Sequence, residues 1–337
     1  MVLDIRENLV RQYQKEAIIV DMLTYLPTLT DPSYLDVVLN ARITCLHVTA
    51  CDSYANFRSA IKSIVTWHQT IKQFSNKLIL ATSVKDIKRA KKENKVSVIL
   101  GMQNAKPIED DLGLLYAFYK LGIRVIQPAY QNQNFLGSGC NERRDVGLSN
   151  FGIKAVEEMN KLGIVIDLSH CNYRTTMDTI ECSKDPVVCT HTCPRALVDH
   201  PRNKTDEEIK ALAEKNGVLG ISAYSPICSV KKGQWPTLED FFVLLDYVVD
   251  LVGDNYVGFG FDFTPLWTKK DFNEYKAMFP ELFGTYELEN LHVKGLSNHS
   301  DVPKVIEKLI DRGYSKRSIM KILGGNFIRV FRTVCGE

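Results

Sequence analysis

The segment SNFGIKAVEEMNKLGIVIDLSH at residues 149–170 contains the unit that recurs along this chain, a helix followed directly by a buried strand. Ser149 can accept hydrogen bonds from the free N–H groups of a helix over Asn150–Leu162, and Gly163 is typical of the position where a helix ends. The apolar run Ile164–Leu168 then predicts a short strand covered on both faces.

Seven further runs are short, apolar and bounded by polar residues or Gly, which predicts eight strands in all: Ala17–Asp21, Ile43–Thr49, Val96–Leu100, Ile123–Pro128, Ile164–Leu168, Pro186–Thr190, Val218–Ala223 and Tyr256–Asp262. Amphipathic stretches between them predict helices, among them Val84–Glu93, Asp110–Leu121, Asn150–Leu162, Asp206–Lys215 and Leu238–Val252. This alternation favours an α/β fold, a parallel sheet closed into a (β/α)₈ TIM barrel, with an open doubly wound sheet as the alternative.

Two or three helices over Val302–Leu309 and Ser315–Val334 are expected to follow the last strand. No linker rich in Pro, Gly or Ser divides the chain, so we expect one domain over residues 1–337.

The composition excludes several classes of protein. The 337 residues include 42 Lys plus Arg and 40 Asp plus Glu. The resulting net charge of +2 gives no positive field strong enough to bind the phosphate backbone of a nucleic acid. The most apolar stretch, Phe241–Val252, is interrupted by Asp246 and Asp250 and is shorter than the roughly 20 residues of a membrane span. We therefore expect neither nucleic acid nor membrane as a partner.

The first sixteen residues and the cysteines bear on the compartment. Residues 1–16 lack the basic head, apolar middle and cleavage site of a secretory signal, which predicts a cytoplasmic protein. The nine cysteines are odd in number and have no paired spacing, so we expect reduced thiols.

Polar side chains stand at or just beyond the carboxyl ends of the predicted strands, where this kind of barrel carries its active site: Asp21, His47, Gln103, Tyr130, His170, His191, Tyr224 and Asp262. His170 and His191 follow successive strands, and two neutral imidazoles at one edge are a good start for a zinc site. The alternative is that each histidine only caps its strand by a hydrogen bond to a loop.

Other groups at the same edge suit hydrolysis. Asp262 ends a run with two glycines and can take a proton from metal-bound water, or can simply be a turn residue or a helix cap. Arg202 can hold a carboxylate with two hydrogen bonds, or can form a surface salt bridge. Cys189 and Cys193 flank His191, and each can be a thiolate ligand or small buried filler.

These segments together resemble the membrane (renal) dipeptidase family of the amidohydrolase superfamily. The resemblance runs nearly end to end, through Leu121–Arg124, Gly147–Gly152, Glu158–Gly163, Ile166–His170, His200–Asn203, Val257–Asp262 and Leu323–Val330. It implies a (β/α)₈ barrel and usually two zinc ions that split dipeptides, some with a D-residue at the carboxyl end. It also implies that His170 and His191 bind one zinc, that Asp262 is the aspartate of the last strand, and that Arg202 and Tyr224 hold the substrate.

The first metal site departs from the family pattern. The family's first strand ends in Asp-x-His-x-Asp, but residues 21–25 read Asp-Met-Leu-Thr-Tyr, so both ligands are missing. Gln103 stands in place of the bridging Glu, and Tyr130 in place of a substrate-binding His. We therefore expect one zinc ion, bound by His170 and His191, with Gln103 and Asp262 as further candidate metal ligands.

Residues 130–134 and 137–145 resemble a bacterial branch of the family that lacks the same ligands, and Asn134 is a further candidate for substrate binding. The function predicted is a metal-dependent hydrolase, a metallopeptidase-like enzyme that cleaves a dipeptide or related small amide. Asp262 and Tyr130 are the candidate catalytic residues, and Arg202, Tyr224, Tyr130 and Asn134 the candidate substrate-binding residues. The alternative is a non-catalytic binding protein or a metal-free lyase in the same pocket. A homodimer is expected by resemblance.

Overall fold

The computed structural model describes residues 2–26 and 31–337. Its strands are β1 (Val20–Thr24), β2 (Cys45–Thr49), β3 (Leu78–Leu80), β4 (Val96–Met102), β5 (Ile123–Ile126), β6 (Val165–Ile166), β7 (Val188–Thr192), β8 (Val218–Ile221) and β9 (Val257–Phe259). The α-helices are α1 (Val2–Glu16), α2 (Pro32–Asn40), α3 (Phe57–Gln73), α4 (Val84–Glu93), α5 (Gly113–Lys120), α6 (Asn150–Leu162), α7 (Tyr173–Cys182), α8 (Asp206–Glu214), α9 (Ser225–Cys228), α10 (Leu238–Val252), α11 (Lys269–Met278), α12 (Pro280–Phe283), α13 (Val302–Asp311), α14 (Lys316–Met320) and α15 (Asn326–Cys335).

Shorter turns complete the chain. Three are 3₁₀-helices, η1 (Lys106–Ile108), η2 (Leu288–Asn290) and η3 (His299–Asp301). A π-helical turn, η4 (Lys321–Gly325), lies between α14 and α15.

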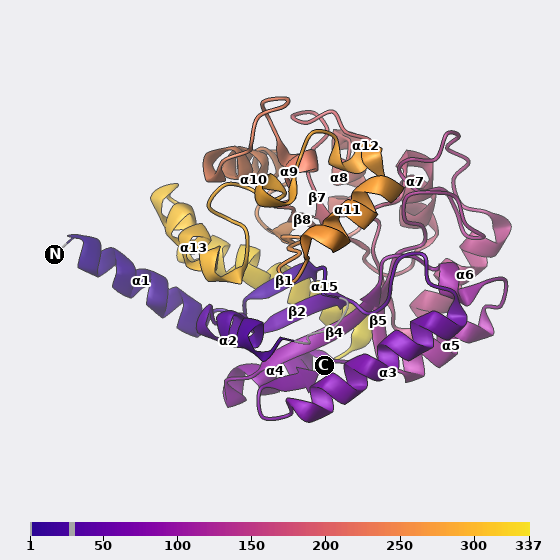
Figure 1. The fold of residues 1–337 in the computed structure, drawn as a ribbon, viewed down its shortest axis with the longest axis horizontal. Coiled ribbons are helices and arrows are strands. Elements are labelled where there is room, and N and C mark those ends of the chain that lie inside the picture. Colours follow the sequence, from indigo (N-terminus) through magenta and orange to yellow (C-terminus); the bar gives the residue numbers. More distant parts are fainter. Residues whose placement is uncertain (1, 27–30) are drawn as a thin grey trace.

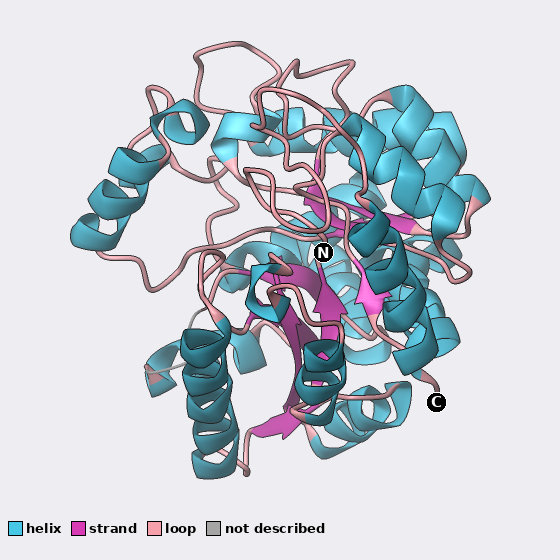
Figure 2. Cartoon of the chain, turned by 90° about the vertical axis from the view of Figure 1, so that its right-hand side faces the viewer, coloured by secondary structure: helices cyan, strands magenta, loops and turns pink. Residues whose placement is uncertain are grey.

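All strand pairs are parallel and belong to two sheets. The first has the order β1-β2-β4-β5-β6, with β3 paired to the start of β4, and the second has the order β7-β8-β9. Single parallel bridges join the two sheets at both seams, between Asp167 and Val188 and between Thr24 and Phe263. The strands form a curled layer in the middle of the molecule with helices around it (Figures 1 and 2).

This architecture confirms the predicted α/β class and parallel sheet. Each of the eight predicted strands overlaps an observed one, and the predicted bounds of α4, α6 and α10 agree with the structure. Ser149 caps α6 by accepting a hydrogen bond from the N–H of Gly152, and Gly163 ends it with a φ of 77°. The three-residue strand β3 was not predicted.

The core has a layer on each side of the strands. On one side, residues of the strands pack against the outer helices. On the other, strand residues such as Val20, Ile99 and Val188 pack with Phe327 and Phe331 of α15. Because both faces are covered, strands such as β4 are buried along their whole length.

Helix α15 covers the amino-terminal ends of the strands. The guanidinium of Arg329 donates hydrogen bonds to the carbonyl oxygens of Asn216, at 2.6 Å, and Asn255, at 2.9 Å, just before β8 and β9. The opposite, carboxyl-terminal edge is therefore the edge left for a pocket.

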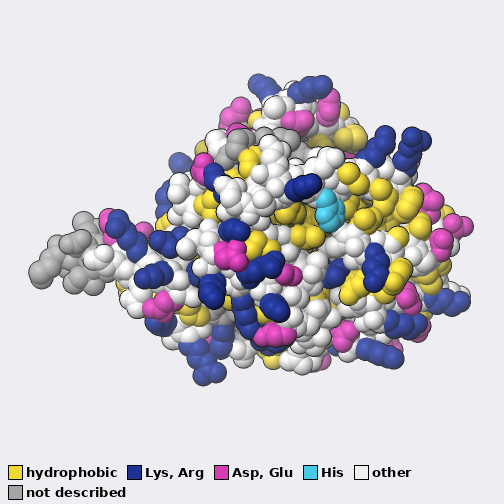
Figure 3. All heavy atoms as spheres, turned by 90° about the horizontal axis from the view of Figure 1, so that it is seen from below, with side chains coloured by type: hydrophobic (Ala, Val, Ile, Leu, Met, Phe, Trp, Pro, Cys, Tyr) yellow, Lys and Arg dark blue, Asp and Glu magenta, His cyan; other side chains and the backbone are white. Residues whose placement is uncertain are grey.

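The surface is mixed in charge. Seen from below, Lys and Arg side chains gather beside α1, and elsewhere on this face both charge signs are interspersed (Figure 3). Within residues 2–26 and 31–337, no helix has the length and apolar character needed to cross a membrane.

Candidate active site

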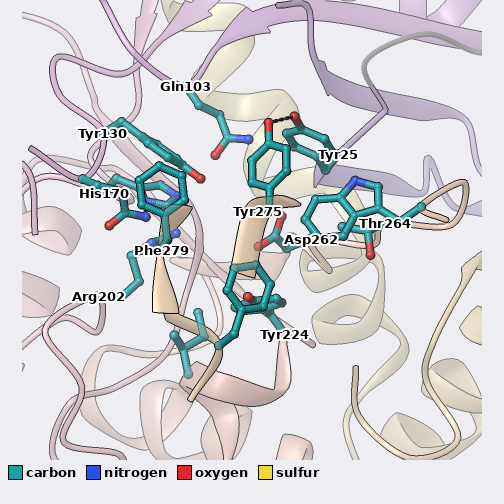
Figure 4. A pocket seen from close by; sticks show the side chains of 14 residues that line it. Tyr25, Gln103, Tyr130, His170, Arg202, Tyr224, Asp262, Thr264, Tyr275 and Phe279 are labelled. Atoms are coloured by element: carbon teal, nitrogen blue, oxygen red, sulfur yellow. Dashed lines mark hydrogen bonds between the residues drawn. The ribbon is translucent and has the colours of Figure 1, made fainter. Parts of the chain in front are cut away.

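A pocket opens at the carboxyl-terminal edge of the strands and encloses about 580 Å³ of empty space, counting its mouth. It contains most of the residues predicted for the site, and Figure 4 shows these side chains around one cavity. The lining residues are Tyr25, Gln103, Tyr130, Gln131, His170, Arg202, Tyr224, Ile227, Asp262, Thr264, Trp267, Tyr275, Phe279 and Phe283.

The two predicted histidines face each other. The Nε2 atoms of His170 and His191 are 3.0 Å apart; His170 follows β6 and lines the pocket, while His191 lies in β7 and is fully buried. Burial lowers the pKa of both imidazoles well below its usual value, and the nearby Arg202 cation lowers it further. Both rings are therefore neutral, which is the form that binds a metal.

Each imidazole is oriented through its other nitrogen. Nδ1 of His191 is 2.7 Å from the hydroxyl oxygen of Thr190, which in turn donates to the carboxylate of Asp167 at 2.6 Å. Nδ1 of His170 is 3.2 Å from the side-chain amide nitrogen of Gln131. The Thr190 hydroxyl therefore accepts from the Nδ1–H of His191 and leaves Nε2 of that ring free for a metal. The amide of Gln131 donates to Nδ1 of His170.

Asp262 stands directly beyond β9 with a φ of 58°, which is uncommon for a residue other than glycine. Its N–H donates to the carbonyl oxygen of Leu23 at 2.9 Å. Burial raises the pKa of its carboxyl to about 7; the Arg202 cation opposes this rise, and the Asp21 and Asp167 carboxylates add to it.

Gly260 explains how the segment after β9 comes so close to β7, which lies on the far side of β8 in the sheet. A Cβ atom at this position would lie 1.8 Å from the backbone oxygen of Thr190. Only glycine permits this approach, which brings the segment carrying Asp262 next to β7.

Arg202 is buried and held by the backbone of two strand ends. Its guanidinium donates to the carbonyl oxygen of Ser169 and to that of His191, the latter at 2.5 Å. A guanidinium has five N–H donors, so others are free for a ligand. This fixed cation makes the pocket suitable for a carboxylate.

The two predicted tyrosines line the same pocket. The ring of Tyr130 lies against His170, with centroids 4.0 Å apart, and burial raises the pKa of Tyr130 and Tyr224. Both hydroxyls therefore stay protonated and can donate a hydrogen bond.

Asn134 does not line the pocket. Its amide nitrogen donates to the side-chain oxygen of Asn104 at 2.8 Å and to the carbonyl oxygen of Pro128 at 2.7 Å. Its own oxygen accepts from the N–H of Leu136 at 2.8 Å, so this side chain orders its loop.

The model of the family described as membrane dipeptidase (peptidase family M19) matches residues 38–292 and 282–335 of this chain. The chain belongs to the membrane dipeptidase family. The dipeptidase verJ of Clonostachys rogersoniana is 28% identical over 283 residues, which are 83% of this chain and 66% of that protein. Dipeptidase 3 of Mus musculus is 27% identical over 71% of this chain and 45% of its own length. The chain thus spans less than two thirds of the length of these curated relatives.

Solved structures agree with the family assignment. An amidohydrolase from Pseudomonas aeruginosa superimposes with a TM-score of 0.89 at 31% identity, covering 97% of this chain and 99% of that one. A metallopeptidase from Rhodobacter sphaeroides, liganded with a phosphinate mimic of the dipeptide L-Ala-D-Ala, has a TM-score of 0.77 at 18% identity, covering 95% of this chain and all of that one. The second likeness shows a shared fold.

The residues at the end of β1 form hydrogen bonds with distant parts of the chain. The hydroxyls of Tyr25 and Tyr275 are hydrogen-bonded, and the hydroxyl of Tyr275 donates to Asp52 at 2.6 Å. The carboxylate of Asp21 accepts from the N–H of Phe261 at 2.9 Å. The end of β1 therefore binds other parts of the protein, including the segment that leads to Asp262.

The spacing of His170 and His191 suits a metal ion. Two nitrogen ligands of one tetrahedral zinc lie about 3.3 Å apart, close to the 3.0 Å between His170 and His191. Among the described residues, however, no group of three His, Cys, Asp or Glu side chains is placed to hold a metal. Gln103 and Asp262 line the same pocket, although the amide nitrogen of Gln103 donates to Thr49 at 2.6 Å. His170 and His191 are thus spaced as two nitrogen ligands of one metal ion would be.

The cysteines on either side of His191 are buried. Burial raises the pKa of Cys193 to about 12 and also raises that of Cys189, so both thiols stay protonated. They fill space in the core.

The sequence reasoning missed the aromatic side of the pocket. Trp267, Tyr275, Phe279 and Phe283 come from the segment around α11 and α12, for which no path was predicted. The available signal was the density of aromatic residues over positions 267–283.

Proposed function

We propose that this protein is a metal-dependent hydrolase that cleaves a dipeptide or a related small amide bearing a free carboxylate. The observation that carries this proposal is that His170, Arg202 and Asp262 line one pocket, with His191 behind it at 3.0 Å from His170. Membership of the dipeptidase family supports the reaction class. It does not favour a non-catalytic binding protein or a metal-free lyase.

The charged residues of the pocket have separate roles. Arg202 binds the carboxylate of the substrate, because it is the buried cation that lines the cavity. Asp262 takes a proton from the attacking water and passes it to the leaving nitrogen, a task suited to a carboxyl whose pKa is about 7. The hydroxyls of Tyr130 and Tyr224 donate hydrogen bonds to the oxygen of the reacting carbonyl.

One zinc ion or similar divalent cation is proposed, held by His170 and His191 with Gln103 as a candidate oxygen ligand and with Asp262 beside it as the base. When bound, such an ion lowers the pKa of water and polarises a carbonyl group. Tyr25 supports a single ion. It stands just beyond β1, and its hydroxyl is not among the Cys, His, Asp and Glu ligands that zinc prefers.

We also infer that the two sheets form one closed (β/α)₈ barrel and one domain over residues 1–337. The bridges at both seams support closure. A homodimer remains a proposal from the family resemblance.

The test combines metal binding with turnover. Metal-free protein is titrated with Zn²⁺ in a calorimeter, and hydrolysis of L,L and L,D dipeptides is followed with and without a chelator. We expect about one ion per chain, with turnover that the chelator removes and zinc restores. His170→Ala and His191→Ala should lose both, whereas His68→Ala, a histidine that bonds to the carbonyl oxygen of Leu121 outside the pocket, should keep both. Turnover that is unaffected by the chelator would overturn the proposal.

A further inference from the structure

One side of the pocket is a continuous aromatic surface, here called the aromatic wall: Tyr25, Trp267, Tyr275, Phe279 and Phe283. The rings touch one another in sequence. Centroids are 5.5 Å apart between Tyr25 and Trp267, 5.0 Å between Trp267 and Tyr275, and 6.4 Å between Tyr275 and Phe279. Trp267 also lies 6.4 Å from Phe283. The wall thus offers an apolar surface to a ligand.

The aromatic wall is held in place by contacts with the rest of the protein. Phe279 and Phe283 belong to a small hydrophobic core of their own with Phe272 and Leu291. Tyr275 is fixed at its hydroxyl, which donates to Asp52 and is hydrogen-bonded to that of Tyr25. The wall therefore has a defined position above the reacting groups before a ligand arrives.

The pocket has few groups that could pair with a second charge on the substrate. Arg202 and Asp262 are the charged groups among its described lining residues, and the proposed reaction already uses both. Asp262 is the carboxylate among the described lining residues, and the side chains of the aromatic wall carry no charge that could pair with an ammonium group. The free amino group of a dipeptide would then be buried without a carboxylate of its own, which is unfavourable.

We propose that the preferred substrate is an N-acylated amino acid whose acyl group is aromatic and uncharged, packed on the aromatic wall with its carboxylate at Arg202. This inference rests on the proposed function, because it takes the amide bond as the bond that is cleaved. Water adds to the amide carbonyl, the C–N bond breaks, and the products are an aromatic carboxylic acid and a free amino acid. No oxidant or further reactant is needed.

The test uses four glycine compounds, which removes stereochemistry at the carboxyl-terminal residue, and the two dipeptides are taken in the L form. Phenylalanylglycine and alanylglycine are compared with phenylpropanoylglycine and propanoylglycine, which differ from them only in lacking the amino group. Zinc-loaded protein is assayed for kcat/KM, and zinc-loaded and metal-free protein for Kd by calorimetry. Burial of a phenyl ring predicts that phenylpropanoylglycine exceeds propanoylglycine about tenfold or more. It should also exceed phenylalanylglycine about tenfold or more, because the latter buries an unpaired ammonium.

Three variants test whether the aromatic wall causes the preference for the phenyl compound. Trp267→Ala should reduce the ratio between phenylpropanoylglycine and propanoylglycine about fivefold or more, through loss of ring contact. Trp267→Phe, which keeps an aromatic ring, should retain most of the ratio. Tyr116→Ala removes an exposed aromatic residue of α5 outside the pocket and should leave the ratio unchanged.

The outcomes separate this inference from the proposed function. If the dipeptides are cleaved as well as or better than their analogues without the amino group, the inference is overturned and the hydrolase function stands. If nothing is cleaved but phenylpropanoylglycine binds most tightly, the binding preference stands and the hydrolase function fails. Equal kcat/KM and Kd for ring-bearing and small compounds would also overturn the inference.

Discussion

Replacing Arg202 tests the electrostatics of the pocket. The guanidinium lowers the pKa of the Asp262 carboxyl, which burial has raised to about 7, so about half of this carboxyl is charged at pH 7. Arg202→Met removes the cation, so the pKa of Asp262 rises further and less than half remains charged at pH 7. Because the base must be charged to accept a proton, the acid limb of the kcat/KM profile moves to higher pH.

The same substitution weakens substrate binding. Hydrogen bonds to a charged group contribute about 1.5–3 kcal/mol, which corresponds to a loss of about 10- to 150-fold in kcat/KM for Arg202→Met above the acid limb. Arg202→Lys keeps the charge but loses the planar pair of donors. The acid limb of its kcat/KM profile should therefore stay at the wild-type pH, while KM rises.

The assay is the pH dependence of kcat/KM for the wild type and both variants, with thermal unfolding as a check. Arg202→Met leaves the carbonyl oxygens of Ser169 and His191 without this donor, so its Tm should fall by several degrees and the assay should run well below it. An acid limb of Arg202→Met that is unmoved, or that moves to lower pH, would refute the electrostatic reasoning.

Three further predictions concern the metal ligands and the core. His191→Gln should weaken zinc binding by at least about tenfold in a chelator competition, because it removes an imidazole fixed by Thr190; unchanged affinity would contradict the ligand role. Lys204→Met should lower the free energy of unfolding by about 3–5 kcal/mol in urea titration, because Glu208 would lose its buried partner at 3.1 Å, whereas adding Glu208→Gln should recover part of that loss. Gly260→Ala should give a protein that is insoluble or has a much lower Tm, because its Cβ would overlap the backbone of β7; a wild-type Tm would show that β7 and β9 are not so close.

Much of the fold could be predicted because local and long-range signals agree. Helix α6 has a capping serine at one end and a glycine at the other, and the strand after it is apolar throughout, so its bounds followed from the sequence. His170, His191 and Asp262 were predicted together at one edge because parallel strands end on the same side of a sheet. The three-residue strand β3 has too little pattern of its own, and pairing with β4 defines it.

The rest of the pocket depends on contacts that the sequence does not encode locally. Asn134 is turned into its loop by hydrogen bonds with Pro128 and Leu136. The buried His191 does not line the pocket itself and lies against His170, which does. The segment containing Trp267 and Tyr275 is positioned by tertiary contacts with Asp52 and Tyr25, more than 200 residues away in the chain. Long-range hydroxyl contacts of this kind leave no periodic trace in the sequence.

The segment of α11 and α12 has a small hydrophobic core of its own, so it can vary independently of the strands. Its apolar contacts lie among Phe272, Phe279, Phe283 and Leu291, apart from the layers that hold the strands. Exchanging residues 266–291 between relatives should therefore change which compounds are accepted while the catalytic edge keeps its shape. A chain arranged in this way can acquire new substrates without rebuilding its scaffold.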